Sequence, residues 1–194
     1  MDIAIQATTE GQLEKAKGKQ VAWALWDIKS AFNYTQKSAA LVRIGGQHEG
    51  LTRYIHWFFQ LKQATITWDR EKRGATQIKA EVPQGSPLSP VIFLIVLAKA
   101  LEDADIRIYR EIPTYKVKVY SYVDDFNCTA REKATRLKGR RPDAITAAIK
   151  ARTIVSEDLG NHSWTRDTEK GEEIKFRTQG EAMWVGIIFT YDLS

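Results

Sequence analysis

The feature that most constrains this chain is a set of acidic residues placed where apolar segments end. The continuous apolar run 21–26 leads into Asp27, and its length and aromatic content predict a buried central strand. A second predicted strand, 115–123, leads into Asp124 and Asp125 at a turn. The sequence therefore predicts two strand ends that carry carboxylates.

These carboxylates need compensation. A carboxylate at the end of a buried strand costs free energy unless a partner offsets it, and adjacent carboxylates repel one another. A divalent cation removes both costs, and Mg²⁺ prefers oxygen ligands such as carboxylates and phosphates. If the strand ends converge, Asp27, Asp124 and Asp125 form a two-metal site for phosphoryl transfer, with the ions about 3.5–4 Å apart. The alternative is that each is an ordinary turn residue or helix cap.

The rest of the pattern predicts mixed helices and strands without a repeating βαβ order. Helices are expected at 3–17, at 35–44 with Thr35 as N-cap, at 49–61, at 91–103 after the pair Ser89–Pro90, and at 143–159. A hairpin is expected over 64–82 with its turn at 69–74. Further strands are expected at 126–129, 173–176 and 183–189. This order favours an α+β fold with helices on one face of a sheet.

Length and charge limit the possible classes. The 194 residues suffice for one domain and hardly for two, and the 29 basic residues exceed the 24 acidic ones, which suits a polyanionic partner. One cysteine, Cys128, and three histidines exclude a disulfide framework and a zinc cluster and favour an intracellular protein. The longest apolar run, 91–98, is far shorter than the ~20 residues of a membrane span, and the first residues do not resemble a signal peptide.

Five segments, in order, resemble the palm motifs of reverse transcriptases from non-LTR (LINE-like) retrotransposons and group II introns. Residues 26–33 (Trp-Asp-Ile-Lys-Ser-Ala-Phe-Asn) resemble the first motif, 82–90 (Val-Pro-Gln-Gly-Ser-Pro-Leu-Ser-Pro) the second, and 122–125 (Tyr-Val-Asp-Asp) the third. Residues 170–176 are similar to the fourth, and 184–189 to the fifth, the primer-grip region. The resemblance covers about 18–193, and the second motif is the most specific.

The resemblance implies a polymerase palm-type antiparallel sheet, an RRM or ferredoxin-like core packed on helices, with part of the fingers. It implies one partial reverse transcriptase domain over residues 1–194 that performs RNA-directed DNA synthesis. Asp27 and Asp124 would bind two Mg²⁺ ions, for which Mn²⁺ can substitute, while Asp125 assists and the Ile28 carbonyl is a further ligand. The reaction is attack of a primer 3′-hydroxyl on the α-phosphorus of a deoxynucleoside triphosphate.

Further residues are implied to contact the nucleotide and the primer. Phe32 would be the steric gate that excludes a ribose 2′-hydroxyl, with a plain core position as the alternative. Gln84 and Gly85 would contact the nucleotide or template, and Lys170 the leaving pyrophosphate, with an ordinary turn and a surface lysine as the alternatives. The basic stretch 131–141 would follow nucleic-acid phosphates or be a solvated loop. The residues expected near the primer are Tyr122, Trp184 and Gly186.

Two positions depart from the family pattern, because Glu81 replaces a common Gly and Asn33 a common Asp. We expect the N-terminal fingers, the thumb and an endonuclease domain elsewhere in the same polyprotein. The expected partners are an RNA template, a DNA primer and deoxynucleoside triphosphates, without a membrane, and the expected location is the nucleus. Two alternatives stay open: a catalytically inactive nucleic-acid-binding remnant of a decayed element, and a group II intron-type maturase.

Overall fold

A strand that is apolar on both faces lies at the centre of the fold. The computed structural model describes residues 3–45, 48–60, 63–69, 71–77, 82, 85–133, 143–175, 180–184 and 187–191. In β1 (Val21–Ile28) every residue is buried except Asp27, which is half-buried. β1 pairs antiparallel with β5 (Asp125–Glu132) on one side and with β6 (Arg166–Lys175) on the other. Because neighbours flank β1 on both edges, its burial requires helices on both faces of the sheet.

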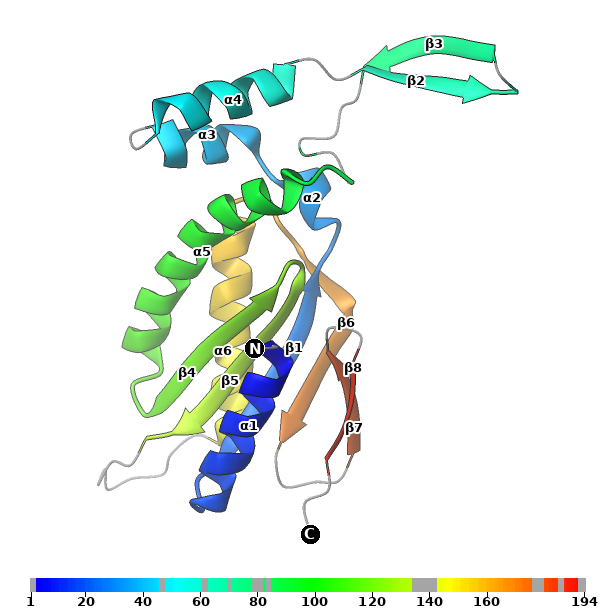
Figure 1. Ribbon diagram of the computed structural model, residues 1–194. Coiled ribbons are helices and arrows are strands. Elements are labelled where there is room, and N and C mark those ends of the chain that lie inside the picture. The colour runs from blue at the N-terminus through cyan, green and yellow to red at the C-terminus, as the bar shows by residue number, and fades with distance from the viewer. Residues whose placement is uncertain are drawn as a thin grey trace. The chain divides into compact units, whose positions relative to one another are not determined.

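Within the described residues, four strands form one antiparallel sheet in the order β4-β5-β1-β6, where β4 is Tyr115–Tyr122 (Figure 1). Helix α5 (Ser89–Glu111) precedes β4, and α6 (Ala144–Gly160) connects β5 to β6. A βαββαβ order with this arrangement of strands is ferredoxin-like. The expected α+β fold, an antiparallel sheet packed on helices, is thus confirmed.

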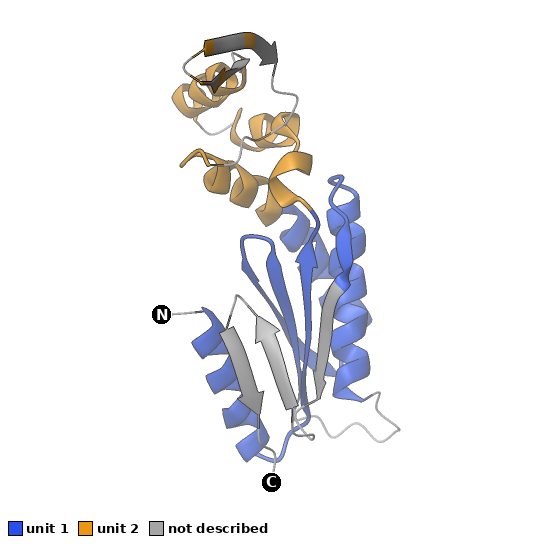
Figure 2. Ribbon diagram, turned by 90° about the vertical axis from the view of Figure 1, so that its right-hand side faces the viewer, with its two compact units in different colours: residues 1–29, 99–194 blue, residues 30–98 orange. Residues whose placement is uncertain are grey.

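Helices cover both faces of the sheet, where the sequence favoured one. Helix α6 packs on one face and α1 (Ile3–Ala16) on the other (Figures 1 and 2). The residues of α1 that are buried are small, Ala4, Ala7 and Gly11, whereas Ile5 and Leu13 are 58% and 55% exposed. Small side chains let the helix backbone approach the sheet closely, and among the large apolar residues of α1 Ile3 packs against the core while Ile5 and Leu13 point outward.

The chain divides into two compact units, residues 1–29 with 99–194 and residues 30–98 (Figure 2). The first unit holds the sheet and a hairpin of β7 (Gly180–Trp184) and β8 (Ile187–Tyr191). Whether residues 1–194 form one partial domain stays a prediction. The second unit contains α2 (Ala31–Tyr34), α3 (Lys37–Gly45), α4 (Glu49–Gln60), the hairpin of β2 (Gln63–Trp68) and β3 (Glu71–Gln77), and the first part of α5.

Two helix predictions were wrong for identifiable reasons. Helix α5 continues to Glu111, past the expected end at 103, because Ala104 and Ile108 extend its buried stripe at four-residue spacing. Thr35 is not an N-cap. It is the C-cap of α2, and its hydroxyl donates to the Ala31 carbonyl oxygen at 2.8 Å.

Several strand boundaries also differ from the predictions. β3 begins at Glu71, inside the segment expected as a turn, and β6 begins at Arg166, well before 173. The segment expected as one strand over 183–189 contributes instead to two paired strands, β7 and β8. Among the helices of the described residues, none combines the length and the apolar character that a membrane span requires.

Candidate active site

Strand pairing brings the two acidic segments together at one end of the sheet. Asp27 in β1 and Asp125 in β5 are direct partners in antiparallel register. Directly opposed residues in such a pair project from the same face, with Cβ atoms about 4.5–5.5 Å apart. The Ile28 backbone N–H donates to the Asp124 carbonyl oxygen at 2.9 Å, which ties the hairpin turn to β1. Residues far apart in sequence thus meet at this end, which we call the tip of the sheet.

The backbone around Asp27 departs from a regular ladder. Asp27 lies within β1, not just past it as the sequence indicated. Trp26 pairs with Gly171 and Ile28 with Arg166, so that residues 167–170 of β6 lie opposite Asp27 alone. Irregularities of this kind redirect side chains and are common beside active sites. Asp27 takes part in other interactions, but its Oδ1 atom is buried and accepts no hydrogen bond from the described residues.

The β4–β5 hairpin has a strained backbone at its turn. Tyr122 pairs with Asp125, so the turn consists of Val123 and Asp124, one residue earlier than the sequence indicated. Val123 has a φ of 56°, in the left-handed region that β-branched residues avoid. Two-residue hairpin turns favour Gly, Asn or Asp where φ is positive, and a left-handed Val costs about 1–2 kcal/mol. Strain that persists at such a position suggests that the turn has a function.

The donor set at the tip suits a hard divalent cation. Asp27, Asp124 and Asp125 are half-buried carboxylates, the ligand type that Mg²⁺ takes in proteins. In the part of the chain that the structure describes, no three His, Cys, Asp or Glu side chains are grouped closely enough to hold a metal ion. Like charges repel, and a cation is what draws such carboxylates together. Their donor type and their place on the sheet therefore suit Mg²⁺, and a magnesium site here stays a prediction.

The second unit contains the residues expected to contact the nucleotide. The half-buried ring of Phe32 in α2 lies 5.6 Å, between centroids, from the ring of Phe93, which is fully buried in α5. One side of Phe32 is therefore held by the core, as the alternative interpretation expected, while part of the ring stays accessible. Gly85 has a φ of 86° and open space around it, so the left-handed backbone and not crowding favours glycine. Gln84 lies outside the described residues.

The other predicted residues are only partly described. Tyr122 ends β4 and is 57% exposed, so it is not buried in the sheet. Ile28 is buried, and it would contribute only its carbonyl oxygen. Lys170 lies in β6 and Trp184 in β7, but their side chains are not described, and Gly186 lies outside the described residues.

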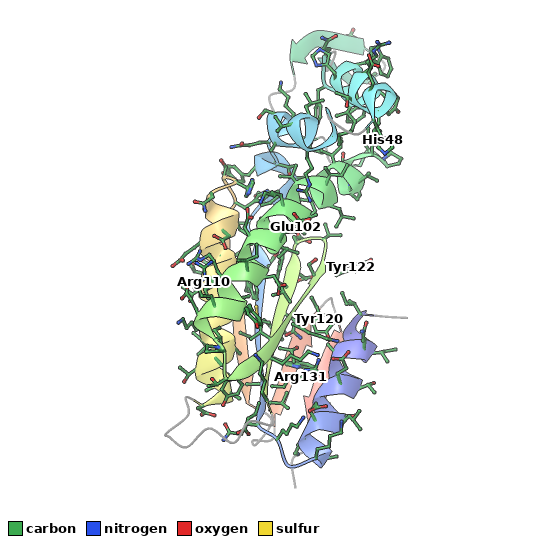
Figure 3. All side chains as sticks on the ribbon, turned by 90° about the vertical axis from the view of Figure 1, so that its left-hand side faces the viewer. His48, Glu102, Arg110, Tyr120, Tyr122 and Arg131 are labelled. Carbon is green, nitrogen blue, oxygen red and sulfur yellow. The ribbon has the colours of Figure 1, made fainter. Side chains whose placement is uncertain are left out.

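From the middle of the sheet toward the opposite end, which we call the base of the sheet, charges are neutralised in a network around Glu10 of α1. Lys118 Nζ donates to Glu10 at 2.6 and 2.8 Å, the Tyr120 hydroxyl donates at 3.2 Å, and Arg131 lies 3.1 Å away. Figure 3 shows Tyr120 and Arg131 on the side of the sheet that faces α1, with Tyr122 farther along β4. The hydrogen bond from Lys118 lowers the pKa of Glu10, and Glu10 raises the pKa of Lys118.

A basic pocket of about 230 Å³ also lies at the base. Arg131 and Lys133 from the predicted basic stretch line it, whereas residues 134–142 lie outside the described residues. Sequence reasoning missed Lys19 and Lys116, because only strand pairing brings these separate segments together. The surplus of cations suits phosphate oxygens. The lining residues are Glu14, Lys19, Lys116, Arg131, Glu132 and Lys133.

Sequence reasoning also missed Asn127, which is fully buried in β5 near the tip. The available signal was a polar amide within a strand whose neighbours Phe126 and Cys128 are apolar and buried.

Known proteins share both the sequence pattern and the fold. Residues 4–180 match the family described as reverse transcriptase (RNA-dependent DNA polymerase), while no curated protein matches the chain. Apo telomerase from Candida tropicalis superposes with a TM-score of 0.70 at 13% identity, covering 97% of this chain and 34% of the telomerase chain. Telomerase from Candida albicans, in complex with a TWJ fragment of telomeric RNA, gives 0.69 at 12% identity, covering 99% and 33%.

These likenesses to solved structures concern the fold alone, and this chain spans about a third of the telomerase chains. The family match has wider meaning because it extends over most of the 194 residues. The chain therefore belongs to the reverse transcriptase (RNA-dependent DNA polymerase) family.

Proposed function

We propose that this chain is the catalytic core of a reverse transcriptase from a non-LTR (LINE-like) retrotransposon. The observation that carries the catalytic assignment is the register that sets Asp27 opposite Asp125 and ties Ile28 to Asp124. The retroelement origin rests on the motifs at 82–90 and 122–125, which resemble those of both LINE-like and group II intron enzymes. In this proposal the fingers, thumb and endonuclease belong to the same polyprotein, which acts in the nucleus. An endonuclease ahead of the chain favours this origin, and a maturase segment behind it favours a group II intron.

The tip residues would hold the catalytic ions. Asp27, Asp124 and Asp125, with the Ile28 carbonyl, would hold two Mg²⁺ ions or their Mn²⁺ substitutes. When bound, these ions supply the Lewis acidity that activates a primer 3′-hydroxyl and neutralises a leaving pyrophosphate. Because Asp27 and Asp125 stand on adjacent paired strands, their backbones are fixed before substrate arrives. Asp124 sits in the turn, where its carbonyl is held by Ile28.

Residues of the second unit and of the later strands would select the substrate. Phe93 holds one side of Phe32, and a ring held in this way suits a steric filter against a ribose 2′-hydroxyl. Gln84, Gly85 and Lys170 would contact the triphosphate or template. Tyr122, Trp184 and Gly186 would contact the primer.

An RNA template and a DNA primer are the proposed macromolecular partners. The net charge of +5 and the basic pocket at the base suit a polyanion. Contacts with phosphates supply affinity without sequence preference, as a polymerase requires. One similar structure, the Candida albicans telomerase, contains a fragment of telomeric RNA.

Primer extension by the full-length polymerase that contains this chain tests the proposal. With an RNA template, a DNA primer and Mg²⁺, the wild type should extend the primer and Asp124→Asn should not. Asp105→Asn is the matched control, because it makes the same change at an exposed position of α5. Extension by Asp124→Asn at the wild-type rate would overturn the mechanism. A wild type that binds primer and template without extension would be the inactive remnant.

The discrimination between deoxyribonucleotides and ribonucleotides tests the role of Phe32 separately. Phe32→Val should admit ribonucleotides, with a loss of discrimination on the order of 10–200-fold. Tyr34→Val is the control, because Tyr34 is an exposed aromatic residue in the same short helix. Unchanged sugar selectivity in Phe32→Val would assign Phe32 to the core alone.

A further inference from the structure

A polar side chain is buried among apolar ones next to the tip carboxylates. Asn127 is 0% exposed and lies in β5, two residues after Asp125 and therefore on the same face. Its direct cross-strand partners are Leu25 in β1 and Tyr120 in β4. Both partners belong to the apolar cluster that packs against α1. A carboxamide in such a cluster costs free energy unless it is hydrogen-bonded.

The two branches of this carboxamide have different environments. The Asn127 Oδ1 atom accepts a hydrogen bond from the Thr129 hydroxyl at 3.1 Å. The Nδ2 atom is buried and has no hydrogen-bond acceptor among the described residues. Thr129 lies farther from the hairpin turn, so the oxygen branch faces the base of the sheet. The nitrogen branch, on the other side of the same planar carboxamide, then points away from Thr129 and is placed to reach the tip.

Carboxylates lie in that direction. Asp125 precedes Asn127 on the same face of β5, about 7 Å away at the usual strand rise. Asp27 is the diagonal neighbour of Asn127 on β1, at a spacing of about 7–8 Å. Short side chains span such distances directly or through one bridging water. A donor and two acceptors of complementary type therefore share one face of adjacent strands.

We propose that Asn127 is a positioning residue, whose Nδ2–H group donates through one bridging water to the carboxylate pair Asp27 and Asp125 and holds it in the orientation that binds Mg²⁺. This inference rests on the proposed function, because it assigns a partner to the proposed metal ligands. Groups that hydrogen-bond to ligating side chains change metal affinity by about 10–100-fold when removed. A hydrogen-bond donor in an apolar cluster lowers stability, so its presence there is expected where the function of the protein requires that donor.

Asn127→Leu is the informative variant, because leucine has a similar size, suits the apolar cluster and removes the donor. We expect its melting temperature without metal to stay close to that of the wild type, because the loss of a buried unsatisfied donor is offset by the loss of the acceptor for the Thr129 hydroxyl. The dissociation constant for Mn²⁺, measured by calorimetric titration without substrate, should rise about 10–100-fold, as should the Mg²⁺ concentration for half-maximal extension. Both are measured on the full-length polymerase.

Two further variants separate positioning from packing. Thr129→Val removes the hydroxyl that holds Oδ1 but keeps Nδ2, so we expect a smaller loss of Mn²⁺ affinity. Asn127→Ser keeps a shorter donor and should recover part of the affinity, whereas Asn127→Ala removes the donor and serves as the test if Asn127→Leu does not fold. Wild-type Mn²⁺ affinity in the folded Leu variant, or in the Ala variant where Leu does not fold, would overturn the inference.

The same titration separates this inference from the proposed function. A wild type that neither binds Mn²⁺ nor extends a primer contradicts the proposed function. Normal Mn²⁺ binding in the wild type and in Asn127→Leu, with binding lost in Asp124→Asn, contradicts only the role of Asn127.

Discussion

The two ends of the sheet differ in the arrangement of their charged side chains, because opposite charges pair at the base and like charges face each other at the tip. At the base, Glu10 lies within hydrogen-bonding or ion-pair distance of Lys118, Tyr120 and Arg131. At the tip, Asp27 and Asp125 face each other with the same sign of charge. The backbones differ as well, because the strand pairing near the base is regular, whereas the tip has an irregular register at Asp27 and a left-handed Val123.

This difference distinguishes residues that stabilise the fold from residues that the proposed activity requires. Opposite charges between α1 and the sheet lower the free energy of the folded chain. Like charges directly opposite one another on paired strands raise it. A natural sequence that keeps both a like-charge pair and a strained turn at one place is expected to do so for a function. Substitutions that remove charge should therefore have opposite effects on stability at the two ends.

The largest expected effect is at the tip. Asp27→Asn removes one of two opposed negative charges, so we expect stability to stay the same or to rise by about 0.2–1 kcal/mol. Primer extension should fall at least about a thousandfold, because a proposed metal ligand is lost. Chemical denaturation and single-turnover extension measure the two effects. A stability loss as large as that of a core substitution would show that the tip is an ordinary structural region.

Removal of a negative charge at the base should instead lower stability and leave primer extension unchanged. Glu10→Gln removes the acceptor charge for Lys118 and Arg131, and we expect a loss of about 1–2 kcal/mol in the free energy of unfolding. Extension per folded molecule should be unchanged. Gln12→Glu, which changes the charge at an exposed position of α1, is a control for the helix itself.

The pH dependence of stability provides an independent check at the base. The hydrogen bond from Lys118 holds the pKa of Glu10 below its ordinary value of 4.5. The contribution of Glu10 is thus fully present above that value and is lost as pH falls through the lower pKa of the folded state. Between pH 7 and acid pH, the wild type should lose more stability than Glu10→Gln. Parallel profiles would show that the network contributes nothing measurable.

The grouping of the tip residues was accessible from the sequence, whereas their local geometry was not. The apolar runs alone left open that these are ordinary turn residues, and the resemblance in motif order associated Asp27 with Asp124 and Asp125. The turn at Val123 was not predictable, because valine is among the residues least suited to positive φ. The network around Glu10 joins three distant elements, and no local pattern in the chain indicates such contacts. The roles of Gln84, Lys170, Trp184 and Gly186 stay predictions.

The strained turn offers a smaller test of the same contrast. Val123→Gly should raise stability by roughly 0.5–1 kcal/mol, because relief of the left-handed strain exceeds the entropy that glycine adds to the unfolded chain. Extension should slow several-fold, because the turn that carries Asp124 becomes less rigid. Val119→Gly in β4, where φ is not positive, should instead lose stability. Equal losses in both variants would mean that Val123 stores no strain.

The smallest expected effect concerns the base. It tests whether the base, besides stabilising the fold, contacts the primer–template. Lys116 lines the basic pocket and is exposed, and Lys116→Ala should weaken primer–template binding by a few tenths of a kcal/mol at moderate salt. The slope of log affinity against log salt should fall by about 0.9 if one phosphate contact is lost. Lys150→Ala, on α6 and so on the opposite face, is the control.

The length of the duplex makes this last test sharper. Lys116 pairs with Arg131, and Arg131 with Val21, so the pocket lies six strand positions from Asp27. At about 3.3 Å per residue this is roughly 20 Å, the length of about six base pairs. A primer duplex of eight pairs should therefore show the altered slope in Lys116→Ala, and one of four pairs should not. A slope that changes equally with both duplexes would mean that nucleic acid reaches the base by another path, and the two ends would then act independently.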